Sequence, residues 1–571
     1  MDKKEVARVL AEIATLLELK GENPFKSRAY LNAARTIEAL DADLDELLRE
    51  GRLLEVENIG QGIAERINEL VTSGRLGYYE DLKTAIPSGM VEMLRIPGLG
   101  PKRAKAVCDA LGIGTLGELE YACHENRLAE LKGFGTKSQE NILKNIAFLK
   151  QFRERHLLSE GQVQAETVVA AIRRAPGIVR WSVAGSLRRR RETIKDIDIV
   201  VSSPDPEPVM FVFCEHVGVE TVIARGPTKS SVRLRGGIQV DLRVVDDSQF
   251  PFALLYFTGS KEHNIALRGR ALKMGLKLNE YGLFEGDTLL PCPTEEAIYE
   301  RLGLALIPPE LREDTGEIEA SERGELPHLV EEGDLQGIFH NHSNWSDGKN
   351  SIEQMAHAAQ AAGYAYMGLS DHSQTAAYAG GLTIEEVRQQ QEEIDGLNAR
   401  RLGIHILRGI ESDILPDGSL DYPDDVLAAF DFVIASVHSG FLISEAEMTR
   451  RIVKAVENPY TTILGHPTGR LLLARDGYAV DIDQVLEACI QHEVAIEVNA
   501  NPHRLDINWH QCRRAHEAGC RVSINPDAHA VQGIADVVFG IGTARRGWIE
   551  PREVLNALSL DELEAKRQAR L

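Results

Sequence analysis

The sequence contains no long hydrophobic run. No apolar stretch approaches the roughly 20 residues that a helix needs to cross a bilayer, and the first segment, MDKKEVARVLAEIATLLELK, has the pattern of an amphipathic helix instead of a signal peptide. A membrane protein and a secreted protein are both disfavoured, so the expected location is the cytoplasm. With 571 residues, of which 43% are hydrophobic and 26% charged, the chain is expected to be globular and to form several domains.

Cysteine pairs and an overall excess of basic residues are also absent. The seven cysteines contain no CxxC pair, so reduced thiols are expected instead of a disulfide framework. The net charge of -23 is unfavourable for nucleic-acid binding, in which Lys and Arg provide much of the affinity. Net charge averages over domains, however, and Arg188 to Arg191 form a local basic cluster.

An acidic stretch separates two halves of different character. It reads 310-ELREDTGEIEASERGELPHLVEEGD-334, begins just after Pro308 and Pro309, and lacks a sustained apolar period. We interpret this stretch as the connection between domains.

Three glycine turns recur in the first half, in 58-NIGQGIAERI-67, 96-IPGLGPKRAKAV-107 and 132-KGFGTKSQENIL-143. In each, a G-x-G turn leads directly into an amphipathic helix, whose first backbone N–H groups are free to bind a phosphate. One copy is equally well explained as an ordinary helix end, but three copies resemble helix-hairpin-helix elements, which bind the DNA backbone without reading sequence. The predicted DNA-binding glycines are Gly60, Gly62, Gly98, Gly100, Gly133 and Gly135.

Alternating carboxylates follow in 181-WSVAGSLRRRRETIKDIDIVVS-202. Residues i and i+2 of a strand share a face, so Asp196 and Asp198 should point the same way. Asp241 lies in a second alternating strand, 238-IQVDLRVV-245, that could supply a third carboxylate. Like charges side by side favour a bound divalent cation; a solvent-facing strand edge is the alternative. Ser186 and Arg189, just after the glycine turn, are placed to hold the outer phosphates of a nucleotide.

Together with 256-YFTGSKEHNIALR-268, these motifs resemble a family X DNA polymerase, a relative of DNA polymerase beta, over roughly residues 1 to 315. The resemblance implies two-metal phosphoryl transfer with Mg²⁺, in which Asp196 and Asp198 bind both ions and Asp241 binds the catalytic one and helps to activate the primer 3' hydroxyl. The implied partners are gapped or primer-template DNA and deoxynucleoside triphosphates. The implied nucleotide site comprises Gly185, Ser186, Arg189, Tyr256, Phe257, Gly259 and Asn264, and Arg268 would brace the template strand.

Other nucleotidyltransferases, which modify RNA ends or antibiotics, share the G-S and D-x-D pattern, but the glycine turns and YFTGS favour templated DNA synthesis.

One departure from the family concerns lyase chemistry. Where DNA polymerase beta has a lysine that forms a Schiff base with an abasic sugar, this chain has Arg66, whose guanidinium cannot serve as an amine nucleophile. Lys26 and Arg28 could still bind a 5' phosphate.

In the second half, short apolar runs recur between helical patterns, as in a series of βαβ units. Nearly every run ends in His, Asp or Glu, and such strand ends meet at one rim of a β/α barrel. Imidazole and carboxylate donors in this number suit several ions of zinc, manganese or iron. The candidate ligands are His340, His342, Asp347, His372, Glu411, His438, His466, Asp527 and His529, with Asp371, Asn499 and Asn501 as weaker candidates.

These residues resemble the motifs of the PHP (polymerase and histidinol phosphatase) family. The resemblance implies a distorted seven-stranded β/α barrel with three metal ions, Mn²⁺ or Zn²⁺, that activate water and hold a phosphate ester. Fusion to a family X polymerase implies 3'-5' exonuclease or 3'-phosphatase action, with cleavage at abasic sites as a further candidate activity. A free phosphate monoester is the alternative substrate, and a scaffold that only holds structural metal is the alternative function.

The expected fold is therefore multidomain α/β, with helix-hairpin-helix domains, an α+β nucleotidyltransferase palm and a distorted (β/α)7 PHP barrel. The expected domains are a lyase-like DNA-binding domain (1–85), a helix-hairpin-helix domain (86–155), the palm (156–245), a nucleotide-selection subdomain (246–315), a linker (316–334) and the PHP domain (335–571). The protein is expected to act as a monomer, without a membrane partner, in filling short gaps during base excision repair.

Overall fold

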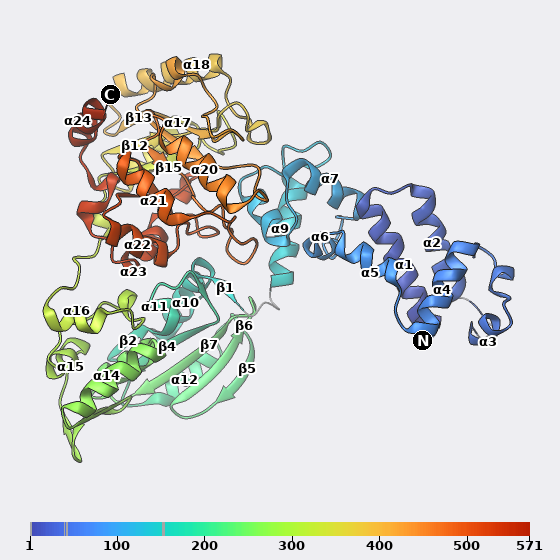
Figure 1. Cartoon of the computed structure of the whole chain (residues 1–571). Coiled ribbons are helices and arrows are strands. Elements are labelled where there is room, and N and C mark those ends of the chain that lie inside the picture. Colours follow the sequence, from blue (N-terminus) through green and yellow to red (C-terminus); the bar gives the residue numbers. More distant parts are fainter. Residues whose placement is uncertain (1–2, 39, 41–43, 151–154, 571) are drawn as a thin grey trace. The chain divides into compact units, whose positions relative to one another are not determined.

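The computed structural model describes residues 3–38, 40, 44–150 and 155–570. The chain divides into two compact units, Met1–Ile146 and Ala147–Leu571. Helices and strands are labelled in Figure 1. None of the helices in the described ranges is both long and apolar enough to cross a bilayer.

The first unit is helical. Its described helices are α1 (Lys3–Lys20), α2 (Pro24–Glu38), α3 (Leu44–Arg49), α4 (Gln61–Ser73), α5 (Gly77–Thr84), α6 (Ser88–Met93), α7 (Pro101–Leu111), α8 (Leu116–His124) and the start of α9 (Thr136–Lys150). The amphipathic pattern of α1 places Val6, Leu10, Ile13 and Leu17 in the core. The helical content predicted for the first part of the chain is confirmed.

The second unit begins with a five-stranded sheet in the order β2-β4-β7-β6-β5. The strands are β2 (Arg180–Val183), β4 (Asp196–Ser202), β5 (Val219–Arg225), β6 (Lys229–Leu234) and β7 (Gln239–Val245). β4 and β7 are parallel, and the other pairs are antiparallel. The apolar residues of β4 and β7 face a core shared with α10 (Leu158–Ile172) and α12 (Pro206–Cys214), so the alternate polar residues lie on the opposite face.

A smaller helical and β region follows the palm sheet. It comprises α13 (Phe250–Thr258), α14 (Lys261–Lys273), α15 (Glu295–Arg301) and an antiparallel sheet of β8 (Leu276–Asn279), β9 (Gly282–Glu285) and β10 (Thr288–Leu290). The acidic stretch expected to be a linker contains helix α16 (Glu317–Arg323), whose Ile318 and Ala320 are buried in this region's core. The stretch is therefore packed against the preceding region.

The last part is a seven-stranded parallel sheet whose strands follow one another in chain order. They are β11 (Gly337–Asn341), β12 (Tyr366–Leu369), β13 (His405–Asp413), β14 (Phe432–Ser436), β15 (Ile463–Leu464), β16 (Ala495–Asn499) and β17 (Val522–Asn525). A parallel bridge between Asn341 and Ala528 links the two ends of the sheet into a nearly closed barrel. Helices including α17 (Ile352–Ala361), α18 (Ile384–Ala399), α20 (Glu445–Val456), α21 (Ile482–Gln491), α22 (Trp509–Ala518) and α23 (Val537–Arg546) connect the strands or follow the last one. The predicted fold class is confirmed.

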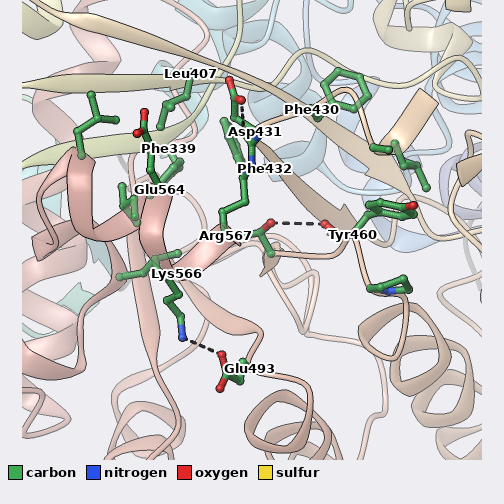
Figure 2. A pocket seen from close by; sticks show the side chains of 17 residues that line it. Phe339, Leu407, Phe430, Asp431, Phe432, Tyr460, Glu493, Glu564, Lys566 and Arg567 are labelled. Carbon is green, nitrogen blue, oxygen red and sulfur yellow. Dashed lines mark hydrogen bonds and ion pairs between the residues drawn. The ribbon is translucent and has the colours of Figure 1, made fainter. Parts of the chain in front are cut away.

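The C-terminal helix α24 (Leu560–Arg570) packs near the N-terminal end of the barrel (Figure 2). Its Leu560 and Leu563 contact the cluster that contains Phe339 and Phe432, and Lys566 forms a 3.0 Å ion pair with Glu493. A cavity of about 90 Å³ remains between helix and barrel, well below the roughly 300 Å³ of a small ligand site. We interpret this end of the barrel as a stabilising face, as is usual for β/α barrels.

Candidate active sites

Three carboxylates lie together on the polar face of the palm sheet. Asp198 on β4 is the register partner of Asp241 on the parallel strand β7, and Asp196 shares the face of Asp198. Burial raises the pKa of Asp198 to about 7, with further contributions from Asp196 and Asp241. Burial followed by the charge of Asp241 also raises the pKa of Asp196. Such mutually destabilised carboxylates suit a bound divalent cation, which would relieve the repulsion.

Gly185 lies against this carboxylate group. Its φ is +61°, and a Cβ there would be 2.2 Å from Oδ2 of Asp198. Glycine is therefore required both by the left-handed backbone and by the close approach of the carboxylate. Ser186 follows in the short helix α11 (Gly185–Arg188) and is partly exposed.

The arginines of the local basic cluster, Arg188 to Arg191, are engaged with partners inside the fold. Arg189 is only 8% exposed, and its guanidinium donates to the carbonyl of Thr258 and, at 3.1 Å, to Glu313. Arg188 pairs with Glu295, and Arg190 donates to Gln162 at 3.0 Å. The run leaves the short helix α11 through a turn, so successive side chains reach different partners. Arg191 is more exposed than Arg188 and Arg189, with 45% of its side chain accessible to solvent.

The YFTGS segment forms the end of helix α13 and the turn into α14. Tyr256 and Phe257 lie in the last turn of α13, and their rings meet edge to face at 5.1 Å. The amide of Asn264 donates to the carbonyl of Tyr256 at 2.8 Å, which ties α14 to α13. Gly259 has φ +71°, and a Cβ there would lie 2.9 Å from Nη1 of Arg189. The exposed guanidinium of Arg268 donates to the Asn264 carbonyl at 3.2 Å.

Each predicted glycine turn of the first unit leads into a helix. Gly60 and Gly100 are the N-cap residues of α4 and α7, and Gly135 immediately precedes α9. A Cβ at any of these three positions would meet nothing within 4 Å. Gly98 and Gly133 have φ values of +84° and +91°, which favour glycine, and Gly62 lies in the first turn of α4. The turns therefore leave open space next to helix N-termini, as a bound phosphate requires.

Arg66 lies in a cluster of aromatic and basic side chains. It donates to the hydroxyl of Tyr30, and its guanidinium stacks 4.0 Å from the ring centroid of Tyr78. Lys26 approaches the same Tyr78 ring at 5.4 Å, so the fold brings this lysine close to Arg66. A hydrogen bond with Tyr78 raises the pKa of Lys26 and keeps its amine protonated. Arg28 is exposed on the same helix, α2.

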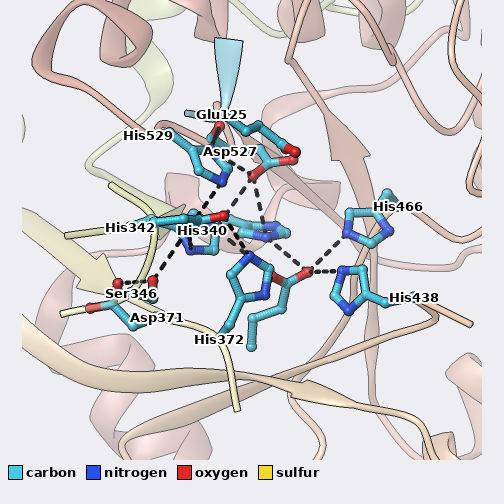
Figure 3. Close-up of polar contacts among 12 residues, drawn as sticks. Glu125, His340, His342, Ser346, Asp371, His372, His438, His466, Asp527 and His529 are labelled. Carbon is cyan, nitrogen blue, oxygen red and sulfur yellow. Dashed lines mark hydrogen bonds and ion pairs between the residues drawn. The ribbon is translucent and has the colours of Figure 1, made fainter. Parts of the chain in front are cut away.

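The nine predicted metal ligands converge at the C-terminal rim of the barrel (Figure 3). Glu411 lies at the centre: its Oε1 is 2.9 Å from Nε2 of His466 and 3.2 Å from Nε2 of His438. On the other side, Asp347 is 3.5 Å from both His372 and His529. Ligand atoms within 4.8 Å of one another form four overlapping groups: His342, Asp347, His372 and His529; His340, His466 and Asp527; His340, His342 and Glu411; and His372, Glu411 and His438.

Several of these buried donor atoms are unsatisfied by the protein. Within the described residues, Nε2 of His340, both ring nitrogens of His342 and Oε2 of Glu411 accept or donate no hydrogen bond. Buried polar groups without partners are costly, and bound cations would satisfy them. The mixed nitrogen and oxygen donors fit Zn²⁺, Mn²⁺ or iron.

The charges of the cluster also suit cation binding. Burial alone would raise the pKa values of Glu411 and Asp527, but the surrounding histidines hold both well below their usual range. Burial would lower the pKa of His438, but Glu411 and Asp413 raise it to about 9. The carboxylates are therefore ionised at neutral pH. Their charges raise the pKa values of His340, His372 and His438 despite burial, whereas burial lowers the pKa values of His342 and His466.

Three of the ligands have a left-handed backbone. φ is +57° at His340, +23° at His466 and +52° at Asp527, and these three side chains form one of the possible metal-binding groups. The register of β11 shifts between Ile338 and Asn341, which places His340 in an irregular part of the strand. Non-glycine residues in this region are uncommon and cluster at functional sites.

A second layer of polar residues orients the ligands. Glu497, which the sequence analysis did not single out, is fully buried and lies 2.6 Å from Nδ1 of His340. Asp413, likewise missed, lies 2.6 Å from Nδ1 of His438. Such carboxylate contacts fix the tautomer and direction of a metal-binding imidazole. Both residues lie two positions from a predicted candidate on the same strand, and this spacing was an available signal.

The weaker candidates also belong to this layer. The amide of Asn499 donates to Asp527 at 3.0 Å and to Glu497 at 3.1 Å. Asp371 accepts hydrogen bonds from Ser343, Ser346 and Gln390, so its oxygens already have partners. Asn501 accepts from the backbone of His503 and donates to Asn499 through its own backbone.

Known families match four parts of the chain. These are a helix-hairpin-helix domain (residues 1–76), a SAM-like helix-hairpin-helix tandem (90–147), a DNA polymerase beta thumb (253–313) and a PHP domain (339–501).

Similarity to a characterised type of bacterial protein extends over the whole chain. The DNA polymerase/3'-5' exonuclease PolX of Bacillus subtilis is 41% identical over 569 residues, which are 99% of each chain. DNA polymerase lambda of Rattus norvegicus is 24% identical over 306 residues, 48% of this chain and 50% of that protein. A probable phosphatase of Caldanaerobacter subterraneus subsp. tengcongensis is 31% identical over 137 residues, 22% of this chain and 52% of that protein. The chain therefore belongs to the family X DNA polymerases that carry a C-terminal PHP domain, as the Bacillus subtilis PolX protein does.

Proposed function

We propose that the protein is a DNA-directed DNA polymerase that fills short gaps in base excision repair and carries a 3'-5' exonuclease and 3'-end phosphoesterase in its PHP domain. The observation that carries this proposal is the presence of two separate groups of candidate metal ligands in one chain. One is the Asp196, Asp198 and Asp241 group on the palm sheet, and the other is the nine-ligand cluster on the barrel rim. End-to-end similarity to the Bacillus subtilis polymerase/exonuclease supports both activities.

In the polymerase site, Asp196 and Asp198 would hold two Mg²⁺ ions and Asp241 one of them. When bound, the ions supply charge stabilisation for in-line phosphoryl transfer. Asp241 would also help to activate the primer 3' hydroxyl. The side-chain amide of Gln239 donates to Oδ1 of Asp241 at 2.8 Å, which holds this carboxylate on the face of Asp198.

The residues around this group would bind the deoxynucleoside triphosphate. Ser186 and Arg189 would hold its outer phosphates, which requires that the Arg189 guanidinium exchange a resting contact for the phosphate. Tyr256, Phe257 and Gly259 would line the sugar and exclude ribose, Asn264 would contact the base, and Arg268 would brace the template. The glycine turns, with Lys26 and Arg28, would bind the backbone of a gapped or primer-template DNA.

In the PHP site, the nine ligands would hold three Mn²⁺ or Zn²⁺ ions, which activate water and stabilise the phosphate ester when bound. Glu497 and Asp413 would keep His340 and His438 in the orientation that a cation needs. The proposed substrate is the 3' end of DNA, with an abasic site as a further candidate. We propose the six sequence-based segments as the domains, with 316–334 as a connection that packs on the preceding region through α16. We also propose a monomeric state and a cytoplasmic location.

A gapped primer-template incubated with Mn²⁺, with and without nucleotides, tests this proposal. Extension should occur only with nucleotides, and shortening of the primer or release of a 3' phosphate should occur without them. A PHP domain that is only a scaffold for structural metal is the competing function. It predicts extension without any metal-dependent loss from the 3' end.

A further inference from the structure

The carboxylate of Glu313 lies between the polymerase part of the chain and the PHP barrel, and three arginines surround it. Its Oε1 is 3.1 Å from Nε of Arg189 and 3.0 Å from Nη1 of Arg546, and its Oε2 is 3.8 Å from Arg191. The Glu313 side chain is 10% exposed and that of Arg546 only 1%. Glu313 thus shares one buried negative charge among cations from both parts.

Arg546 is the contribution of the PHP domain to this cluster. It lies at the end of helix α23, and it also donates to the backbone carbonyl of Arg189 at 2.7 Å. The same helix packs tightly on the palm: Phe539 belongs to the palm core, and a Cβ at Gly542 would lie 3.2 Å from the Cβ of Arg190. A helix of the PHP domain therefore supports the arginine turn of the polymerase directly.

Arg189 carries this support to the nucleotide-selection turn. Its guanidinium donates to the carbonyl of Thr258, immediately before Gly259, where a Cβ would meet the same guanidinium at 2.9 Å. The contacts therefore run without a break from Arg546 through Arg189 to the turn that follows Tyr256 and Phe257.

We propose that Arg546 of the PHP domain is a positioning residue for the incoming nucleotide at the polymerase site. The inference rests on the proposed polymerase function. Arg546 takes up part of the charge of Glu313, so Arg189 is held less tightly by that carboxylate and is available to the triphosphate. Without Arg546, the Glu313 carboxylate keeps only Arg189 and the more distant Arg191 as cationic partners among the three arginines. The backbone carbonyl of Arg189 also loses the hydrogen bond that Arg546 donates. A buried carboxylate that loses one partner binds the remaining one more strongly.

The proposal predicts a specific kinetic change. In single-nucleotide insertion on a gapped substrate, Arg546→Ala should raise KM for the deoxynucleoside triphosphate about tenfold and change kcat less, as expected when binding of the nucleotide is weakened. In the Glu313→Gln background the same substitution should change KM less than threefold, because the competing charge is gone. The Arg545→Ala variant is the matched control. Arg545 lies on the same helix, but it pairs with Glu310 at 2.8 Å and donates to the Val330 carbonyl instead of contacting Arg189 or Glu313.

The outcomes separate the inference from the function on which it rests. If the wild-type protein does not extend the primer, the proposed function is wrong. If the wild-type protein extends it but Arg546→Ala leaves KM unchanged, or Arg545→Ala raises KM equally, the inference is wrong. Should Arg546→Ala fail to fold, as judged by thermal melting, Arg546→Gln replaces it. Glutamine keeps a donor for the Arg189 carbonyl but removes the positive charge that Arg546 offers to Glu313, so an unchanged KM in this variant would also overturn the inference.

Discussion

A single methyl group at Gly185 should disable the polymerase while leaving the PHP site intact. The Cβ of Gly185→Ala would lie 2.2 Å from Oδ2 of Asp198, whereas ordinary contacts begin at 3.4 Å. If the backbone holds, the carboxylate must move by about 1.2 Å to relieve the overlap. Metal–oxygen distances tolerate only about 0.2 Å, so Asp198 could no longer hold a cation together with Asp241.

The expected loss can be estimated from this displacement. A misplacement of about 1 Å near reacting groups costs roughly 100-fold in rate, and the loss of one metal ligand adds to it. We therefore expect extension by Gly185→Ala to fall at least about 100-fold, or roughly 2.7 kcal/mol in activation free energy. The left-handed φ of +61° costs alanine a further 1–2 kcal/mol or so of folding free energy.

A matched control separates the two effects. Gly177 also has a left-handed backbone, with φ +81°, but a Cβ there would meet only Oγ of Ser203, at 3.3 Å. Gly177→Ala should therefore lose similar stability in denaturation experiments and keep most of its extension activity. Both variants should retain 3'-end hydrolysis. Extension by Gly185→Ala within threefold of the wild-type rate, in a folded protein, would refute the assignment of Asp198 to the polymerase centre.

Three further predictions test other parts of the molecule. Asp241→Asn should abolish extension but spare 3'-end hydrolysis. Asp527→Asn should abolish 3'-end hydrolysis, spare extension and reduce the bound metal measured by elemental analysis. Loss of both activities in either folded variant would contradict the assignment of two separate sites. Borohydride should trap little covalent complex with a 5'-deoxyribose-phosphate end, because Arg66 offers no amine and the pKa of Lys26 is raised. The Arg66→Lys variant should increase trapping. Efficient trapping by the wild-type protein at Lys26 would disprove this prediction. Burial raises the pKa of Asp536 in the folded protein to about 7. Between about pH 4 and pH 7 the unfolded chain therefore loses this proton before the folded protein does, and the free energy of unfolding should fall as pH rises through this range. Asp536→Asn should then be more stable than wild type by up to about 4 kcal/mol above pH 7, with no gain near pH 4; parallel pH profiles of urea unfolding would rule this out.

The sequence was sufficient to predict the site where the local periodicity of a strand determines the direction in which its side chains point. Alternation in β4 and β7 predicted that Asp196, Asp198 and Asp241 face the same way, and the sheet places Asp198 opposite Asp241. Apolar runs that end in ligands predicted parallel strands with one functional rim, and the barrel is confirmed. In both cases the argument needed only the geometry of a strand and the rule that parallel strand ends meet.

The sequence was insufficient where a side chain depends on partners that are distant along the chain. Four consecutive arginines indicated a local basic cluster, but Arg188 and Arg189 pair with Glu295 and Glu313, which are 107 and 124 positions away. The acidic stretch looked like a connection because it lacks an apolar period, yet its Glu317 is buried and lies 2.6 Å from His263. The sequence around a charged residue does not indicate whether its side chain is solvated or is buried against an opposite charge.

One class of missed residue could nevertheless have been found. Glu497 lies in the apolar run AIEVN, where an ionised side chain is costly unless hydrogen-bonded. Its place two positions before Asn499 sets both on the face that points toward the rim ligands, and Asn525 donates to Glu497 at 2.8 Å from the next strand. The same reasoning finds Asp413, two positions after Glu411. A lone carboxylate within a buried parallel strand, in phase with a predicted ligand, therefore indicates a residue that orients the ligands, because few other roles justify the cost of its burial.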